Sequence, residues 1–211
     1  MTTQQPAPSG PALAASGPVP VTLRVPAAAG QPAMLLRPWS DGDAEALIDV
    51  YRDPVLRRWT RVPVEGPADA ARWLAARHEG WVTGKYLSFA AVEEPPHGKG
   101  GEASRIVATV ALKGPLTSTG VGEVGYWTAA GARGRGVASR ALGALTDWAF
   151  VTFGGGGLHW LHLLHQVDNA ASCRVAEKAG YELNAVLPVR PPFPVPGHLH
   201  VRRRVTPSDA R

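Results

Sequence analysis

The feature of this sequence that most constrains its fold is a strand-like run that leads through a glycine- and arginine-rich turn into a helical run. The strand-like run covers residues 122–128, the turn contains Arg133-Gly134-Arg135-Gly136, and the helical run covers about residues 137–150. A strand and a helix joined by so short a connection pack against each other around a shared core. We therefore expect a sheet with helices packed on it, and neither a helical bundle nor a β-sandwich.

Hydrophobic periodicity in the rest of the chain predicts strands and helices in a mixed order. Strands are expected at residues 21–25, 34–37, 86–92, 105–112, 158–164 and 198–205. Helices are expected after a capping pair of Ser40 and Asp43, at residues 67–81 and at residues 170–179. Residues 95–104 suit an exposed hairpin loop, and the proline-rich residues 190–197 suit an irregular segment. This order indicates an α/β (α+β) fold with a mixed sheet.

The chain is long enough to bury one core and too short for a second catalytic domain. It has 211 residues, of which 45% are hydrophobic. Residues 1–20 consist mainly of Pro, Ala, Gly, Ser, Thr and Gln, and they bury too little apolar surface to offset the entropy of ordering. We predict a flexible tail at residues 1–20, a single domain at residues 21–206 and a short tail at residues 207–211.

Charge, cysteine content and hydropathy narrow the classes of function. The formal net charge of +5 suits an anionic ligand, but the arginines are scattered or belong to the turn, so we expect no nucleic-acid partner. Cys173 is the one cysteine, which excludes an intrachain disulfide and a cysteine metal cluster. No stretch approaches the roughly 20 apolar residues that span a bilayer. We expect a cytoplasmic protein without a membrane partner and leave a homodimer open.

The glycine- and arginine-rich turn has the chemistry of an anion site. The two glycines let the backbone approach a ligand closely, and the first amides of the following helix have no intrahelical acceptor. These amides point outward at the positive end of the helix dipole, where phosphate oxygens bind, and the two arginines add mobile positive charge. In the alternative interpretation, the glycines only turn the chain and the arginines keep it soluble. The residues expected to bind the anion are Arg133, Gly134, Arg135, Gly136, Val137 and Ala138.

Two segments, in the correct order, resemble motifs of a known superfamily. Residues 133–138 look like the Arg/Gln-x-x-Gly-x-Gly/Ala motif of the GCN5-related N-acetyltransferase (GNAT) superfamily, in which these amides bind the pyrophosphate of acyl-CoA. Residues 169–181 are similar to the Asn-x-x-Ser, Glu-Lys, Gly-Phe/Tyr run of its ribosomal-protein N-terminal acetyltransferase (RimJ/RimL-like) branch. The resemblance, which spans about residues 34–205, implies a GNAT-like fold with a central, mostly antiparallel twisted sheet flanked by helices. It also implies acetyl-CoA or another acyl-CoA as cosubstrate.

Acyl transfer to an amine requires a base or a proton path, because a lysine-type amine with a pKa of about 10.4 is mostly protonated at neutral pH. Glu123 is the candidate base, since it precedes the turn on a strand whose opposite face carries Val124 and Tyr126. Burial beside the substrate cleft would make it a better base at neutral pH. The resemblance supports the choice, because many superfamily members carry a glutamate at the matching position. An ordinary surface glutamate is the alternative.

The resemblance also concerns the pantetheine arm and the leaving thiolate. A tyrosine often protonates the thiolate in the superfamily, but Ala176 stands at the matching position here. Ser172, on the first turn of the same helix, is the substitute, with helix capping or packing as the alternative. Asn169 is implied to hydrogen-bond the pantetheine arm. Backbone groups of Trp127 and Thr128 are expected to pair with that arm like an added strand, and the Trp127 amide to polarise the thioester carbonyl.

Three histidines in one apolar run, His159, His162 and His165, raise the question of a metal. Residues three apart on a strand face opposite sides, so only His159 and His165 share a face, and they lie about 20 Å apart at roughly 3.3 Å per residue. Carboxylate and further cysteine partners are missing. We therefore expect no metal site.

Together these features predict an N-acyltransferase that moves an acetyl or similar small acyl group from acyl-CoA to a primary amine by direct attack on the thioester. The acceptor is expected to be a peptide N-terminus or a small-molecule amine, and the sequence does not identify it. A non-catalytic CoA-binding regulatory module is the alternative, because the tyrosine expected at Ala176 is missing.

Overall fold

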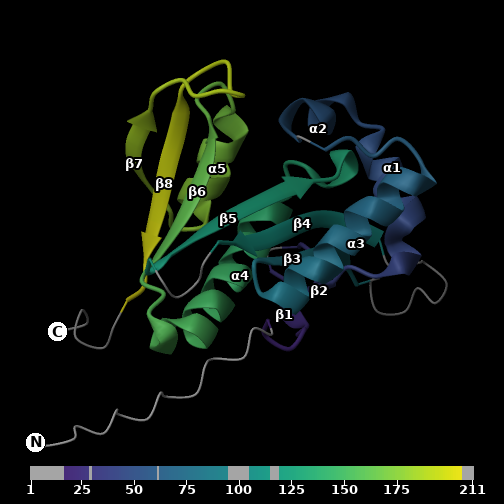
Figure 1. Ribbon diagram of the computed structural model, residues 1–211, viewed down its shortest axis with the longest axis horizontal. Coiled ribbons are helices and arrows are strands. Elements are labelled where there is room, and N and C mark those ends of the chain that lie inside the picture. The colour runs from purple at the N-terminus through teal and green to yellow at the C-terminus, as the bar shows by residue number, and fades with distance from the viewer. Residues whose placement is uncertain (1–16, 29, 61, 95–104, 115–118, 206–211) are drawn as a thin grey trace, which may run out of the picture.

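The computed structural model describes residues 17–28, 30–60, 62–94, 105–114 and 119–205, and these residues form one eight-stranded sheet (Figure 1). The strand order is β1-β2-β3-β4-β5-β6-β8-β7, and every neighbouring pair is antiparallel except β5 with β6. The expected mostly antiparallel mixed sheet is confirmed. The strands are β1 (Leu23–Val25), β2 (Met34–Pro38), β3 (Tyr86–Glu93), β4 (Arg105–Lys113), β5 (Val121–Thr128), β6 (Trp160–Gln166), β7 (Glu182–Leu187) and β8 (Gly197–Arg203).

Five α-helices occur in the described residues, and each covers a face of this sheet or supports a helix that does. They are α1 (Ala44–Tyr51), α2 (Pro54–Trp59), α3 (Pro67–Thr83), α4 (Val137–Phe153) and α5 (Ala170–Lys178). Figure 1 shows α3 lying over β3 and β4 with α1 beside it, and α4 follows β5 and precedes β6 along the chain. The predicted tail at residues 1–16, the loop at residues 95–104 and the last residues from 206 lie outside the described residues.

Two elements of the structure were not predicted from the sequence, namely α2 and β7. Helix α2 has only six residues, so its sequence is too short to show the hydrophobic periodicity of a helix. It begins after Asp53, because the Asp53 carboxylate accepts hydrogen bonds from the amides of Val55 and Leu56. Strand β7 is mostly exposed and lacks an alternating pattern, so only its pairing with β8 identifies it as a strand.

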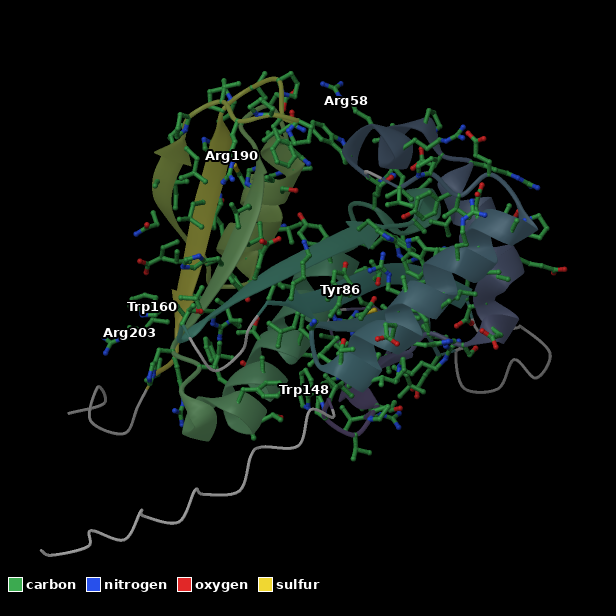
Figure 2. All side chains as sticks on the ribbon, in the orientation of Figure 1. Arg58, Tyr86, Trp148, Trp160, Arg190 and Arg203 are labelled. Carbon is green, nitrogen blue, oxygen red and sulfur yellow. The ribbon has the colours of Figure 1, made fainter. Side chains whose placement is uncertain are left out.

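The core is divided between the two faces of the sheet, and Figure 2 draws the side chains on the ribbon. One cluster lies under α4 and α5 and includes Val110, Leu142 and Leu161. The other lies under α1 and α3 and includes Trp39 and Trp127. Because side chains alternate along β5, its even-numbered residues face α4 and α5 while its odd-numbered residues face α1 and α3. This alternation decides which side of the molecule each candidate site residue reaches.

The start of the α1 segment is fixed to β2 by an ion pair between the partly exposed Arg37 and the buried Asp43. The Arg37 guanidinium donates to both carboxylate oxygens of Asp43 at 2.7 Å, and the same carboxylate accepts from the Ser40 amide at 2.8 Å. Asp43 is only 7% exposed. Burial acts to raise the pKa of Asp43, but the bonds from Arg37 and Ser40 outweigh it and lower this pKa. The capping pair expected at Ser40 and Asp43 is therefore present.

We predict that Asp43→Asn lowers the free energy of unfolding at pH 7 by about 2 kcal/mol, because a neutral amide cannot replace the charge-assisted bonds to Arg37. The pKa of Asp43 is lowered by folding, so its contribution is present above the ordinary aspartate pKa of about 3.9 and is lost as the pH falls through the folded pKa. Urea unfolding at pH 7 and at stepwise lower pH measures this difference, which should shrink in acid.

The matched control is Asp41→Asn, because the Asp41 side chain is 92% exposed two residues away. It should change stability by less than about 0.5 kcal/mol. Equal losses in the two variants, or a loss in Asp43→Asn that does not shrink on acidification, would contradict the structural role of the Asp43 carboxylate.

Candidate functional site

The candidate site lies where the parallel strands β5 and β6 stop pairing. Their register runs from Val121 opposite Trp160 to Val124 opposite Leu163, and the described strands form no further pairs beyond it. Strand β5 continues to Thr128 and stays paired with β4 on its other side, and Figure 1 shows β5 and β6 diverging from this point. The second half of β5 therefore presents one backbone edge to which an extended ligand could bind.

Trp127 lies in this half of β5, and its side chain belongs to the core. The indole is 8% exposed, and it packs against the rings of Trp39 and Tyr51 with centroids 6.0 and 6.2 Å away. The side chain thus anchors the strand.

The position of Trp127 in the register, opposite Thr109 of β4, fixes the backbone of both Trp127 and Thr128. The Ala129 amide donates to the Val107 carbonyl at 2.8 Å. In this antiparallel register the N–H and C=O of Trp127 therefore also face β4, whereas those of Thr128 face the free edge. The expected pairing of a ligand with the Trp127 backbone was wrong, because the direction of a backbone group depends on the β4–β5 register, and Thr128 remains available.

The glycine-rich turn leads directly into α4, as predicted. Gly134 and Gly136 have φ angles of +74° and +73°, in the left-handed region that favours glycine. A methyl group built on Gly134 would meet no atom within 4 Å, so the space outside the turn is open. The side chains of Val137 and Ala138 are buried in the core, which orients the helix so that its first amides face outward. These amides lack intrahelical acceptors and can receive an anion.

The two arginines of the turn are ion-paired, whereas we expected mobile charges. Arg133 is paired with Asp53 at the start of α2, and Arg135 is paired with Glu93 at the end of β3. Burial acts to raise the pKa of Asp53, but Arg133 and the amides of α2 outweigh it and lower this pKa. The sequence-based expectation was wrong on this point, because the acidic partners lie far away along the chain. The arginines fasten the turn to α2 and β3.

Glu123 lies on the α1 and α3 side of the sheet, opposite the face of Val124, as the strand pattern predicts. The expected burial is not found, because the Glu123 side chain is 45% exposed and forms an ion pair with Lys113 of β4 at 2.6 Å. His162 lies opposite Glu123 in the β5–β6 register. Burial lowers the pKa of His162, and the Glu123 carboxylate acts in the opposite direction without outweighing it. A carboxylate and a neutral imidazole therefore lie side by side.

Ser172 lies on the opposite face, at the first turn of α5. It is buried, and the Tyr126 hydroxyl donates a hydrogen bond to its Oγ at 2.9 Å. Burial raises the pKa of Tyr126, so the phenol keeps its proton at neutral pH. The Ser172 amide donates to the Asn169 Oδ1 at 3.2 Å, which makes Asn169 the cap of α5. Ala176 is fully buried in the core.

Tyr126, Lys113 and His162 were not identified from the sequence as site residues. Tyr126 directly precedes Trp127, but the phenol can be linked to Ser172 only through a contact between residues 46 positions apart. Lys113 could be placed beside Glu123 only with the β4–β5 register. The structure thus brings a hydroxyl pair to one side of the diverging strands and a carboxylate, a lysine and an imidazole to the other.

This arrangement can support a transfer between two ligands. The outward amides of α4 suit a phosphate group, the free edge of β5 suits an extended polar chain, and the titratable groups on either side of the strand can accept or donate a proton. In the described part of the chain, no helix is both long enough and apolar enough to cross a bilayer.

Comparison with known proteins identifies the family. Residues 33–182 match the family model described as acetyltransferase (GNAT) domain. No curated protein matches the sequence significantly. The match covers the turn, the strands that diverge beside it and the helix that carries Ser172, so the resemblance drawn from the two motifs is confirmed.

Solved structures with the same fold have low sequence identity to this chain. The ribosomal L7/L12 alpha-N-protein acetyltransferase RimL in complex with coenzyme A is 15% identical, with a TM-score of 0.71 over 89% of this chain and 99% of that one. RimJ from Mycobacterium smegmatis is 20% identical, with a TM-score of 0.66 over 87% and 86%. The microcin C7 self-immunity acetyltransferase MccE, in complex with acetyl-CoA and AMP, is 16% identical, with a TM-score of 0.68 over 81% and 92%.

Family membership also favours an enzyme over the non-catalytic module that the missing tyrosine at Ala176 left open. The fold, the open turn before α4 and the family match agree, and the chain belongs to the GNAT acetyltransferase domain family and is an acetyl-CoA-dependent acetyltransferase.

Proposed function

We propose that this protein transfers the acetyl group of acetyl-CoA to a primary amine, either a peptide N-terminus or a small-molecule amine, by direct attack of the amine on the thioester. The observation that carries the proposal is the open first turn of α4 next to the free edge of β5. The name of one structural neighbour supports a peptide N-terminus as acceptor, since RimL is named as an alpha-N-protein acetyltransferase of ribosomal L7/L12.

The cosubstrate would be held along its length by backbone groups. The pyrophosphate would accept hydrogen bonds from the amides of residues 134–138, and the helix dipole would favour its negative charge. The pantetheine arm would pair with the free edge of β5, where the backbone of Thr128 is available. Because Asn169 uses its Oδ1 to cap α5, its Nδ2 is the group that would donate to the arm. Arg133 and Arg135 would contribute positive potential while staying tied to their carboxylates.

Glu123 is the proposed general base. When the amine nitrogen attacks, an N–C bond forms, and the nitrogen must lose a proton to give the amide. The Glu123 carboxylate would take that proton, directly or through one water molecule. Its partial exposure leaves it accessible to an incoming acceptor, and its ion pair with Lys113 fixes its position on β5. An amide on the free edge of β5 would polarise the thioester carbonyl as the negative charge develops on its oxygen.

Ser172 is the proposed donor to the thiolate that leaves when the C–S bond breaks. Its Oγ already accepts the Tyr126 hydroxyl proton in a hydrogen bond, so its own hydroxyl hydrogen is free to point at the sulfur. A hydroxyl that accepts one hydrogen bond becomes a stronger donor in the next, because the two bonds polarise each other. Tyr126 would thus supply the phenol that the superfamily pattern places at Ala176, acting through Ser172.

The first test is calorimetric titration of the protein with acetyl-CoA, followed by release of free thiol with a panel of amines and peptide N-termini. We expect binding and acceptor-dependent thiol release. Gly136→Glu should weaken acetyl-CoA binding at least about a hundredfold, because a carboxylate at the anion site removes several charge-assisted hydrogen bonds.

Gly136→Asn is the matched control, because asparagine tolerates the left-handed region and carries no charge. It should bind acetyl-CoA within about tenfold of the wild type, since one unfavourable contact costs roughly that much. Unaltered affinity in Gly136→Glu, with an unchanged circular dichroism spectrum, would remove the pyrophosphate assignment. Binding without thiol release for any acceptor would count against amine acetylation.

For the base, we expect Glu123→Gln to lower kcat/KM for the amine by about 10²–10⁴-fold and to remove the acidic limb of its pH profile. Glu182→Gln on β7 is the control, because Glu182 is an exposed strand glutamate away from the site. His162→Ala separates the two neighbouring candidates. If His162→Ala abolishes turnover while Glu123→Gln retains it, the base is the imidazole and the assignment to Glu123 is wrong.

For the leaving group, we expect Ser172→Ala to lower kcat by about a hundredfold, with little change in the dissociation constant for acetyl-CoA. Tyr126→Phe should have a smaller effect, and the double variant should be no worse than Ser172→Ala, because Tyr126 acts through Ser172. Steady-state kinetics and calorimetry on the three variants measure this cycle. Additive losses in the double variant, or a loss confined to binding, would contradict a relay through Ser172.

A further inference from the structure

Four side chains that play no part in the proposed reaction meet between α5 and the sheet: His165, Cys173, His198 and His200. His165 of β6 lies directly opposite His198 of β8 in the antiparallel register. His200 lies two residues further along β8 and therefore points to the same face. Helix α5 covers that face and contributes Cys173. Among the described residues, this is the only group of three or more side chains with suitable ligand atoms close enough to share a metal ion.

The distances within the group are those of a metal coordination shell. One ligand atom from each residue lies within 4.8 Å of all the others. The Cys173 Sγ is 3.3 Å from the His198 Nδ1 and 3.6 Å from the His165 Nε2. In a tetrahedral zinc site with Zn–S of about 2.3 Å and Zn–N of about 2.0–2.1 Å, the sulfur and nitrogen ligands are about 3.6 Å apart. The distance to His165 has this length, and the distance to His198 is about 0.3 Å shorter.

The hydrogen bonds around His165 leave the correct nitrogen available. Its Nδ1 lies 2.8 Å from the carbonyl oxygen of Gln166, and because a carbonyl can only accept, Nδ1 carries the proton and donates it. The Nε2 of the neutral ring then has a free lone pair, and this is the atom that faces Cys173. Metal-bound histidines commonly donate their second ring nitrogen to a backbone carbonyl in this way.

His200 supplies independent support, because it is 1% exposed and neither of its ring nitrogens has a hydrogen-bond partner. The backbone of Tyr181 acts on this imidazole, but it does not reach hydrogen-bonding geometry. Hydrogen bonds between Cys173 and the half-buried histidines account for two of the rings and leave His200 unsatisfied. A bound cation would satisfy it.

We propose that His165, Cys173, His198 and His200 form a tetrahedral binding site for a divalent transition-metal ion of the zinc type. One thiolate and three imidazoles are ligands that such ions prefer over Mg²⁺ or Ca²⁺, and four protein ligands leave no open position for catalysis. The site is therefore structural. It joins β6, β8 and α5, and it holds the helix turn on which Ser172 directly precedes Cys173.

This proposal replaces the expectation of no metal. The distance argument against a pair of His159 and His165 still holds, but it considered one strand only. The other ligands come from β8 and α5, and the sequence does not reveal that those elements cover the same face as His165. The proposal does not depend on the acetyl-transfer function, and its test uses spectroscopy and metal content.

The test uses the full chain, produced without a histidine tag in zinc-containing medium. Mass spectrometry of the purified protein should find one zinc ion per chain. After removal of the metal with a chelator, titration with Co²⁺ should reach one equivalent, with a thiolate-to-cobalt charge-transfer band and the visible bands of a tetrahedral ion. One equivalent of Zn²⁺ should abolish both.

Variants assign the ligands. Cys173→Ser should lose the charge-transfer band, and His200→Asn should weaken cobalt binding by more than the about 10–100-fold that loss of an outer-shell partner costs. His159→Asn, at an exposed position in the same apolar run, should titrate like the wild type. Purified protein that contains no metal and develops no thiolate band with Co²⁺ would overturn the proposal, leaving a hydrogen-bonded cysteine between two histidines. Wild-type affinity in His200→Asn would also overturn the four-ligand site.

Discussion

The parallel pairing of β5 with β6 is the constraint on which the rest of the site depends. Parallel neighbours cannot be joined by a hairpin, so the chain must leave the end of β5, cross one face of the sheet and return to the start of β6. Helix α4 makes that crossing, and its first turn must therefore lie at the carboxyl end of β5. Because pairing stops after Val124 and Leu163, the same crossing places the helix N-terminus beside an unpaired strand edge. One topological requirement thus sets the open helix N-terminus, a candidate anion site, next to a free strand edge.

The electrostatics of the turn follow from the same arrangement. Arg133 and Arg135 were expected to add mobile positive charge to the turn, but both are neutralised by carboxylates from α2 and β3. Fixed backbone dipoles are already oriented before a ligand binds, whereas a flexible arginine loses side-chain entropy on binding. A turn fastened by ion pairs and equipped with outward amides is therefore organised before the cosubstrate binds.

Features that depend on local sequence patterns could be predicted, and features that depend on contacts between distant segments could not. The turn, the capping pair of Ser40 and Asp43 and most of the strands could be predicted because each depends on residues within a few positions of one another. The face of Glu123 followed from strand alternation, but its exposure and its pairing with Lys113 required the β4–β5 register. The contact between Tyr126 and Ser172 and the grouping of Cys173 with three histidines depend on which helix covers which strands, and periodicity does not carry that information.

The Asp53 carboxylate contacts two segments of the chain, helix α2 and the glycine-rich turn. It accepts hydrogen bonds from the first amides of α2 and also receives the guanidinium of Arg133 from the turn, 80 residues further along the chain. A helix of six residues is too short to be stable by itself, so α2 depends on this carboxylate and on its packing. The helix and the turn consequently belong to one cooperative unit, which opens and closes together. Amide hydrogens in the two segments should then exchange with solvent at matching rates, although no sequence neighbour connects them.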